Sequence, residues 1–194
     1  MIDARDDVIF SARPAIDWRE LYGNAHPVEI EIGSGKGAFL LAAAAERPEV
    51  NFVGVEVQPR WVRWMHTRLA ANPLPNVRVV RGDALVLLRH FVPAASVRAL
   101  HVYFPDPWWK RRHQKRRVVT PELATLAWRA LERGGVLHLA TDVRERFDAM
   151  LADLTREPFA VEIGEDGTRH VPTNFERKYR RQGRPISRAT LRKP

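Results

Sequence analysis

Short apolar runs alternate along the chain with longer stretches whose apolar residues recur at helical spacing. The first such run, 28–32, ends in a Gly-rich turn, and the alanine-rich stretch that follows is typical of a helix stopped by Pro48. The same alternation continues to about residue 156. It predicts strands at 28–32, 51–57, 76–81, 99–104 and 136–140, and helices at 38–47, 60–71, 84–91, 121–132 and 142–156.

This order of elements predicts the fold class. Strands that alternate with helices at this spacing are joined by right-handed crossovers, which produce a mainly parallel sheet covered by helices on both faces. We therefore expect a doubly wound α/β protein. A chain of 194 residues fits one domain, so we expect a single domain over 1–194.

Acidic side chains stand at or near the carboxyl end of each predicted strand. In open α/β sheets ligands bind beyond these ends, at the point where the strand order reverses. Any single acid there is explained equally well as a stabiliser of the next helix N-terminus. The series is Glu31, Glu56, Asp83, Asp106 and Asp142.

The Gly-rich turn and the acids together indicate the kind of ligand. Gly33, Gly35 and Gly37 allow positive φ and close backbone approach to a ligand. An NAD fingerprint, G-x-G-x-x-G, is matched only imperfectly, and a P-loop motif is absent. Several carboxylates favour a nucleotide with positive charge, and S-adenosylmethionine has that character. An NAD-dependent oxidoreductase remains the alternative.

The charge of the chain indicates a nucleic-acid partner. The net charge is +9 and the isoelectric point about 10.7, which favours a polyanion because Lys and Arg neutralise phosphates. Segment 104–117 concentrates this charge: after FPDPWW, six Lys or Arg fall within residues 110–117. A solvated charged surface over a tryptophan pair is the structural alternative.

Other parts of the sequence limit compartment and chemistry. The absence of cysteine fits a reducing cytoplasm, and no apolar run suggests a membrane partner. The histidines show no metal spacing, so we predict no metal site and interpret His101 and His138 as structural.

Six motifs occur in order, and their combination is far more specific than any one of them. They are EIGSGKG at 31–37, GVE at 54–56, GDA at 82–84, FPDPW at 104–108, ATD at 140–142 and TNFE at 173–176. Over 28–186 the sequence resembles the bacterial tRNA (guanine-N7)-methyltransferase family. The resemblance implies a seven-stranded, Rossmann-like class I methyltransferase that uses S-adenosylmethionine. Its reaction would be methylation of N7 of guanine at position 46, in the variable loop of tRNA, by a monomer or homodimer.

The resemblance also assigns roles to residues. It implies that Asp106 is catalytic and that the cofactor is bound by Glu31, Gly33, Gly35, Glu56, Asp83 and Asp106. It implies substrate binding by Lys110, Asp142, Thr173, Asn174, Phe175 and Glu176, and RNA binding by Arg112, His113, Gln114, Lys115, Arg116 and Arg117. The basic segment 169–194 is expected to contact RNA as well. A methyltransferase for another RNA and a non-catalytic RNA-binding module remain open.

Overall fold

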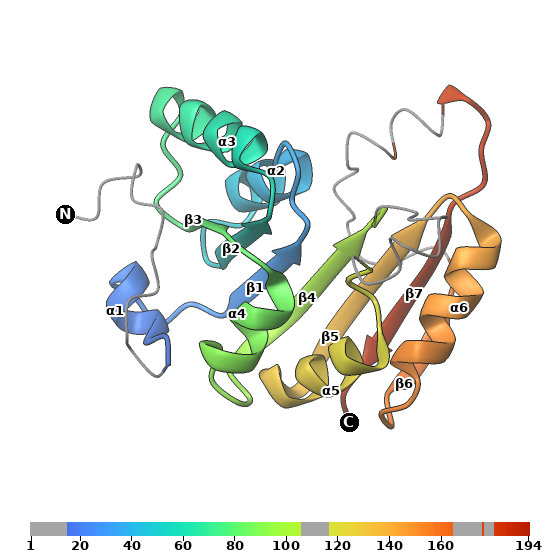
Figure 1. Cartoon of the computed structure of the whole chain (residues 1–194). Coiled ribbons are helices and arrows are strands. Elements are labelled where there is room, and N and C mark those ends of the chain that lie inside the picture. The colour runs from blue at the N-terminus through green and yellow to red at the C-terminus, as the bar shows by residue number, and fades with distance from the viewer. Residues whose placement is uncertain (1–14, 106–116, 165–175, 177–180) are drawn as a thin grey trace.

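One mixed sheet organises the computed structural model, which describes residues 15–105, 117–164, 176 and 181–194 (Figure 1). The strand order within these residues is β3-β2-β1-β4-β5-β7-β6. The strands are β1 (Val28–Ile32), β2 (Asn51–Glu56), β3 (Val77–Arg81), β4 (Val97–Tyr103), β5 (Leu131–Thr141), β6 (Ala160–Ile163) and β7 (Ser187–Arg192). The first five are parallel, and β7 lies antiparallel between β5 and β6. The strand order reverses between β1 and β4, which is where such sheets bind ligands.

Helices cover both faces of this sheet. They are α1 (Trp18–Tyr22), α2 (Ala38–Glu46), α3 (Pro59–Ala71), α4 (Ala84–His90), α5 (Pro121–Ala130) and α6 (Arg144–Leu154). Figure 1 shows α4, α5 and α6 one after another across the lower part of the view, and α2 next to α3 in its upper left part. The predicted doubly wound α/β class is therefore confirmed.

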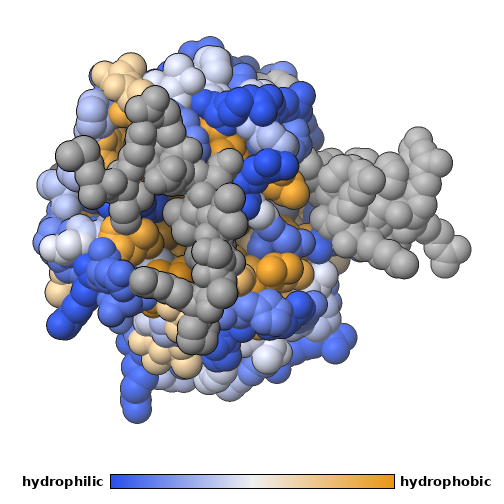
Figure 2. All heavy atoms as spheres, turned by 60° about the vertical axis from the view of Figure 1, so that its left-hand side comes forward, coloured by the Kyte–Doolittle hydropathy of each residue, from blue (hydrophilic) through white to orange (hydrophobic). Residues whose placement is uncertain are grey.

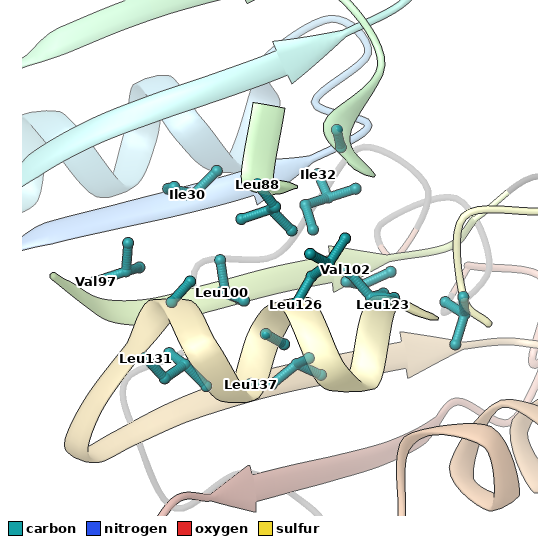
Figure 3. Packing of buried hydrophobic residues seen from close by; sticks show 14 of the residues in the cluster. Ile30, Ile32, Leu88, Val97, Leu100, Val102, Leu123, Leu126, Leu131 and Leu137 are labelled. Carbon is teal, nitrogen blue, oxygen red and sulfur yellow. The ribbon is translucent and has the colours of Figure 1, made fainter. Parts of the chain in front are cut away.

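Two hydrophobic clusters follow from the alternation of side chains along the strands. Ile30 and Ile32 of β1 pair in register with Leu100 and Val102 of β4, and all four pack with residues of α4, α5 and α6 (Figure 3). The opposite face packs against α2 and α3 through residues such as Phe52. Side chains alternate between faces with a period of two, so β1 can be buried over its whole length.

Ten elements lie where the sequence predicts them, with shifted ends. The largest shift is at β5, which begins at Leu131 instead of residue 136, because the strand continues through Gly134 and Gly135. Gly134 has a φ of 74°, which lets the strand bend there without ending. Three further elements were not individually predicted: α1, β6 and β7.

The start of α5 shows how local sequence sets a helix end. The Thr120 hydroxyl accepts a hydrogen bond from the Leu123 N–H at 3.3 Å, and Pro121 follows in the first turn. Both residues are favoured at a helix start, since the cap satisfies a free N–H and Pro lacks one. Thr120 is thus the N-cap of α5.

A charged side chain is buried in the middle of the sheet. Glu29 of β1 is 2% exposed, and its carboxylate accepts hydrogen bonds from Arg98 at 2.6 Å and Arg47 at 2.9 Å. His101 Nε2 lies 3.0 Å from the second carboxylate oxygen, and His101 Nδ1 lies 3.0 Å from the Tyr103 hydroxyl. Since an ionised carboxylate only accepts, Nε2 is the donor to Glu29.

The environment of Glu29 determines its ionisation. Burial alone would raise the pKa of Glu29, but the hydrogen bonds and charges of His101, Arg98 and Arg47 outweigh burial and hold it well below its usual range. The His101 ring also stacks on His138 with centroids 5.2 Å apart. His101 and His138 thus take part in a polar network inside the sheet.

The surface of the described residues is mixed in polarity. Figure 2, which brings the left-hand side of Figure 1 forward, shows hydrophobic residues reaching the surface near the middle of that face, with hydrophilic ones around them. Within the described ranges, none of the helices has the length and apolar character needed to cross a bilayer.

Candidate cofactor site at the carboxyl edge of the sheet

The Gly-rich turn leaves β1 through backbone conformations that favour glycine. Gly33 has a φ of 75° and Gly35 a φ of 54°. The N–H groups of Gly33 and Ser34 both donate to the Val55 carbonyl, at 2.9 and 3.1 Å, which fixes the turn against β2. A Cβ atom placed on Gly33 or Gly35 would meet nothing within 4 Å. The turn therefore borders open space that a ligand can fill.

Gly54 has a different role, which sequence reasoning missed. A Cβ atom at Gly54 would lie 2.5 Å from Leu40 Cδ2 and 3.0 Å from Ser34 Oγ. The absence of a side chain therefore lets α2 and the Gly-rich turn pack directly on β2. The GVE motif gave the only sequence signal for this close contact.

Glu56 ties the Gly-rich turn to the end of β2. One carboxylate oxygen accepts the Gly35 N–H at 2.8 Å, and the other accepts the Gln58 N–H at 2.7 Å. A carboxylate has about four lone-pair sites, so both oxygens can accept further hydrogen bonds. The predicted role of Glu56 in cofactor binding is compatible with this geometry and stays a prediction.

Glu31 is the most unusual residue at this edge. It is 4% exposed, and its Oε2 atom is buried without a hydrogen-bond partner among the described residues. Burial raises the pKa of Glu31 to about 8; the charge of Glu56 acts in the same direction, while the Leu40 backbone opposes it. A buried carboxylate without a counter-charge is costly, and a cationic ligand group would remove that cost.

Asp83, at the start of α4, is an exposed helix cap in this structure. Its Oδ1 atom accepts the N–H groups of Leu85 and Val86 at 2.7 and 3.3 Å. Its Oδ2 atom takes no part in the cap, so the capping role does not use the whole carboxylate. The order β3-β2-β1 brings the strand ends that carry Asp83, Glu56 and Glu31 to neighbouring positions at one edge.

The chain leaves β4 in a strained conformation. Phe104 has a φ of 51°, although it is not glycine, and its N–H donates to the Ala140 carbonyl at 2.8 Å. Such conformations cost about 1–3 kcal/mol and occur often at functional sites. Asp106, the predicted catalytic residue, comes two residues later and lies outside the described residues.

The other predicted site residues are described only in part. Asp142 pairs with Arg184 at 2.6 Å, and buried Glu176 pairs with Arg188 at 2.6 Å. Arg117 is partly buried. The pKa of Arg146 is lowered, first by the burial of Arg146 itself and then by the charge of Arg117. The residues outside the described ranges are Lys110, Arg112, His113, Gln114, Lys115, Arg116, Thr173, Asn174 and Phe175.

Two tryptophans beside the Gly-rich turn were also missed by the sequence analysis. Lys36 Nζ lies 5.0 Å from the ring centroid of Trp61 and 5.7 Å from that of Trp64. Arg60 Cζ lies 4.5 Å from the Trp61 ring. The W-x-x-W spacing in a basic stretch was the signal that could have identified them.

A hollow of about 510 Å³ lies elsewhere, beside α1 and the residues that lead into β1. Two of its polar side chains are already used locally. Asp17 caps α1, and Asn24 Oδ1 accepts hydrogen bonds from His26 and Asn51. We therefore place the candidate site at the carboxyl edge, where Glu31 lacks a counter-charge.

Solved structures with a similar fold include methyltransferases. The 16S rRNA methyltransferase KamB has a TM-score of 0.68 and 16% identity, with 94% of this chain and 96% of that chain covered. The aminoglycoside resistance methyltransferase NpmB1 has a TM-score of 0.63 and 17% identity, with 91% of each chain covered. The sheet and its helices thus define the Rossmann-like fold of class I methyltransferases.

Sequence comparison identifies the family within that class. Residues 25–189 match the family described as "Putative methyltransferase". The tRNA (guanine-N(7)-)-methyltransferase of Myxococcus xanthus is 39% identical over 184 residues, which cover 92% of this chain and 89% of the relative. The Pseudomonas aeruginosa (strain ATCC 15692) protein of the same name is 42% identical over 177 residues, with 88% and 72% covered. The chain belongs to the tRNA (guanine-N(7)-)-methyltransferase family.

Proposed function

We propose that this protein transfers a methyl group from S-adenosylmethionine to N7 of guanine in tRNA, at position 46 in the variable loop. Family membership over nearly the whole chain is the observation that carries the proposal. The further parts of the proposal are a single catalytic domain over 1–194, RNA contacts by 112–117 and 169–194, and action in the cytoplasm as a monomer or homodimer.

The residues at the carboxyl edge fit such a cofactor. When bound, S-adenosylmethionine supplies an electrophilic methyl group on a sulfonium, together with an α-ammonium group. Glu31 offers a buried carboxylate whose Oε2 atom lacks a partner in the described part of the chain, as a cationic group requires. Glu56 holds the Gly-rich turn in place and can accept hydrogen bonds from ribose hydroxyl groups. Asp83, at the end of the next strand, has a second carboxylate oxygen that the helix cap does not use.

The reaction depends on positioning guanine N7 against the methyl group more than on proton transfer. Guanine N7 has an available lone pair and no proton, so its attack on a methyl group needs no general base. Positive charge then develops on the purine, and a carboxylate close to the base stabilises it. Asp106 is our candidate for that group, as the acid that follows the strained end of β4.

Replacing Asp106 by alanine should lower turnover by about a hundredfold, the effect typical of removing one electrostatic stabiliser. We expect the melting temperature to stay within one or two degrees of the unchanged protein. Single-turnover methylation of tRNA with labelled cofactor measures the effect. Unchanged single-turnover rates would remove Asp106 from the reaction.

The function itself is tested by incubating the protein with unmodified tRNA and methyl-labelled S-adenosylmethionine, followed by mapping of the modified nucleotide. The expected product is N7-methylguanine at position 46. Label at another nucleotide would retain the chemistry and correct the target. Absence of label with every tRNA tested, despite saturable cofactor binding, would contradict the proposal and favour a binding module.

A further inference from the structure

We propose that the start of α3 and the adjoining Gly-rich turn form a second contact surface for the substrate tRNA. In this surface Trp61 and Trp64 stack on unpaired bases, and basic side chains contact the neighbouring phosphates. We call it the tryptophan surface and define it by Lys36, Arg60, Trp61, Arg63 and Trp64. The inference rests on the proposed function, because it takes tRNA to be the substrate.

The arrangement of α3 separates this surface from the core. Val62, Met65 and Leu69 are the buried residues of the helix, and their spacing marks the side that packs on the sheet. Trp61 and Trp64 are three residues apart and therefore lie on neighbouring positions of the helix surface. Trp64 is 46% exposed. The indole ring of Trp64 thus faces solvent, and the helix packs on the sheet through other residues.

Cations already lie against both rings. Lys36 Nζ is within 6 Å of both centroids, at 5.0 and 5.7 Å, and the Arg60 guanidinium is 4.5 Å from the Trp61 ring. Exposed cation–π contacts contribute only about 0.5–1 kcal/mol each. Stacking of a nucleic-acid base on an aromatic side chain contributes about 1–3 kcal/mol. A base can therefore displace one of these cations from a ring with a net gain.

The charge of the surface favours RNA over a protein or lipid partner. From Pro59 to Ala71 the chain has three arginines and no Asp or Glu. Arg60 and Arg63 are exposed and flank the tryptophans. Aromatic rings for bases next to cations for phosphates are the combination that single-stranded nucleic acid requires.

The surface is continuous with the candidate cofactor site. Lys36 belongs to the Gly-rich turn, next to Gly35, whose N–H is bound by Glu56. Glu56 also binds the Gln58 N–H, and Gln58 is the N-cap of α3. One carboxylate thus connects the turn to the helix that carries both tryptophans. RNA with its target guanine at the cofactor site passes beside this surface.

Steady-state methylation of full-length tRNA by Trp64→Ala tests the proposal. We expect the KM for tRNA to rise at least about fivefold, the effect of losing one stacked base, with kcat at saturating tRNA nearly unchanged. Trp64→Phe keeps an aromatic face and should recover most of the affinity. Cofactor affinity, measured by calorimetry, and the melting temperature should stay the same in both variants.

The basic residues are tested through salt dependence. The double variant R60E/R63E should reduce the slope of tRNA affinity against salt concentration by about two phosphate contacts. Arg133→Glu is the control for a single charge reversal. It changes an exposed residue near the amino end of β5, away from the carboxyl ends of the strands, and should leave the slope closer to that of the unchanged protein.

Two results would overturn the tryptophan surface. One is an unchanged KM in Trp64→Ala together with an unchanged salt slope in R60E/R63E. The other is a loss of cofactor affinity equal to the loss of tRNA affinity, which would make the tryptophans supports of the Gly-rich turn. Fluorescence anisotropy with labelled tRNA separates this inference from the proposed function. If the protein does not methylate tRNA but the variants lose tRNA binding, the surface stands and the function fails.

Discussion

Ligand-free protein with Glu31→Gln is expected to be more stable than the unchanged protein at pH 8 and above, yet to bind S-adenosylmethionine roughly a hundredfold more weakly. The pKa of Glu31 is raised from 4.5 to about 8 in the folded state by burial and by Glu56. Glu31 therefore leaves the free energy of unfolding unchanged below about pH 4.5 and lowers it as the pH rises toward 8. Glutamine does not ionise, so the variant avoids a destabilisation on the order of a few kcal/mol.

The loss of affinity arises because the cationic ligand loses the carboxylate that would pair with it. A buried carboxylate attracts a cationic ligand strongly because water does not screen the pair, and removing one partner of such a pair costs about 2–5 kcal/mol. Thermal unfolding at pH 6 and pH 9, with calorimetric titration of the cofactor, measures both effects. Glu46→Gln at the exposed end of α2 is the control. A variant that binds the cofactor normally would contradict the role of Glu31.

Replacing Glu29 by glutamine should have the opposite effect on folding. It leaves Arg47, Arg98 and His101 without their common carboxylate, and breaking a buried pair typically costs about 3–5 kcal/mol. Arg47 and Arg98 reach water in part, so we expect a value near 3 kcal/mol. Urea unfolding at pH 7 measures the loss.

The pH dependence of this loss also has a definite sign. The folded-state pKa of Glu29 is lowered, so its stabilisation is present above about pH 4.5, the ordinary value, and disappears as the pH falls further. The difference between Glu29→Gln and the unchanged protein should therefore shrink in acid. Glu29 and Glu31 stand two residues apart on the same face of β1, so each is the matched control for the other. Equal effects on folding would contradict both assignments.

Sequence patterns predicted the parallel half of the fold because most positions of those strands are buried and rich in apolar residues. β1 is buried at every position, and β2 likewise, so their runs stand out from the helices between them. β6 and β7 lack that signal. β6 is exposed at all four positions. β7 has the sequence SRATLR, whose polar residues do not indicate a buried strand, although β7 lies between β5 and β6.

The candidate site was predictable to the level of residue type and strand end, but not of environment. Sequence placed Glu31, Glu56 and Asp83 at one edge, yet it could not distinguish a buried carboxylate without a counter-charge from a helix cap. That difference depends on which helices cover the edge. The interior charge of Glu29 was missed because its partners are 18, 69 and 72 residues away in the chain.

The place of β7 between β5 and β6 affects how the protein is made. β6 pairs with β7, and β7 pairs with β5, so within the described ranges residues 160–163 have no sheet neighbour until residues 187–192 exist. A growing polypeptide leaves the ribosome from its N-terminus, so the five parallel strands can assemble early while β6 remains unpaired. The sheet is then completed only when β7 has been translated. The same strand provides Arg188, which pairs with Glu176.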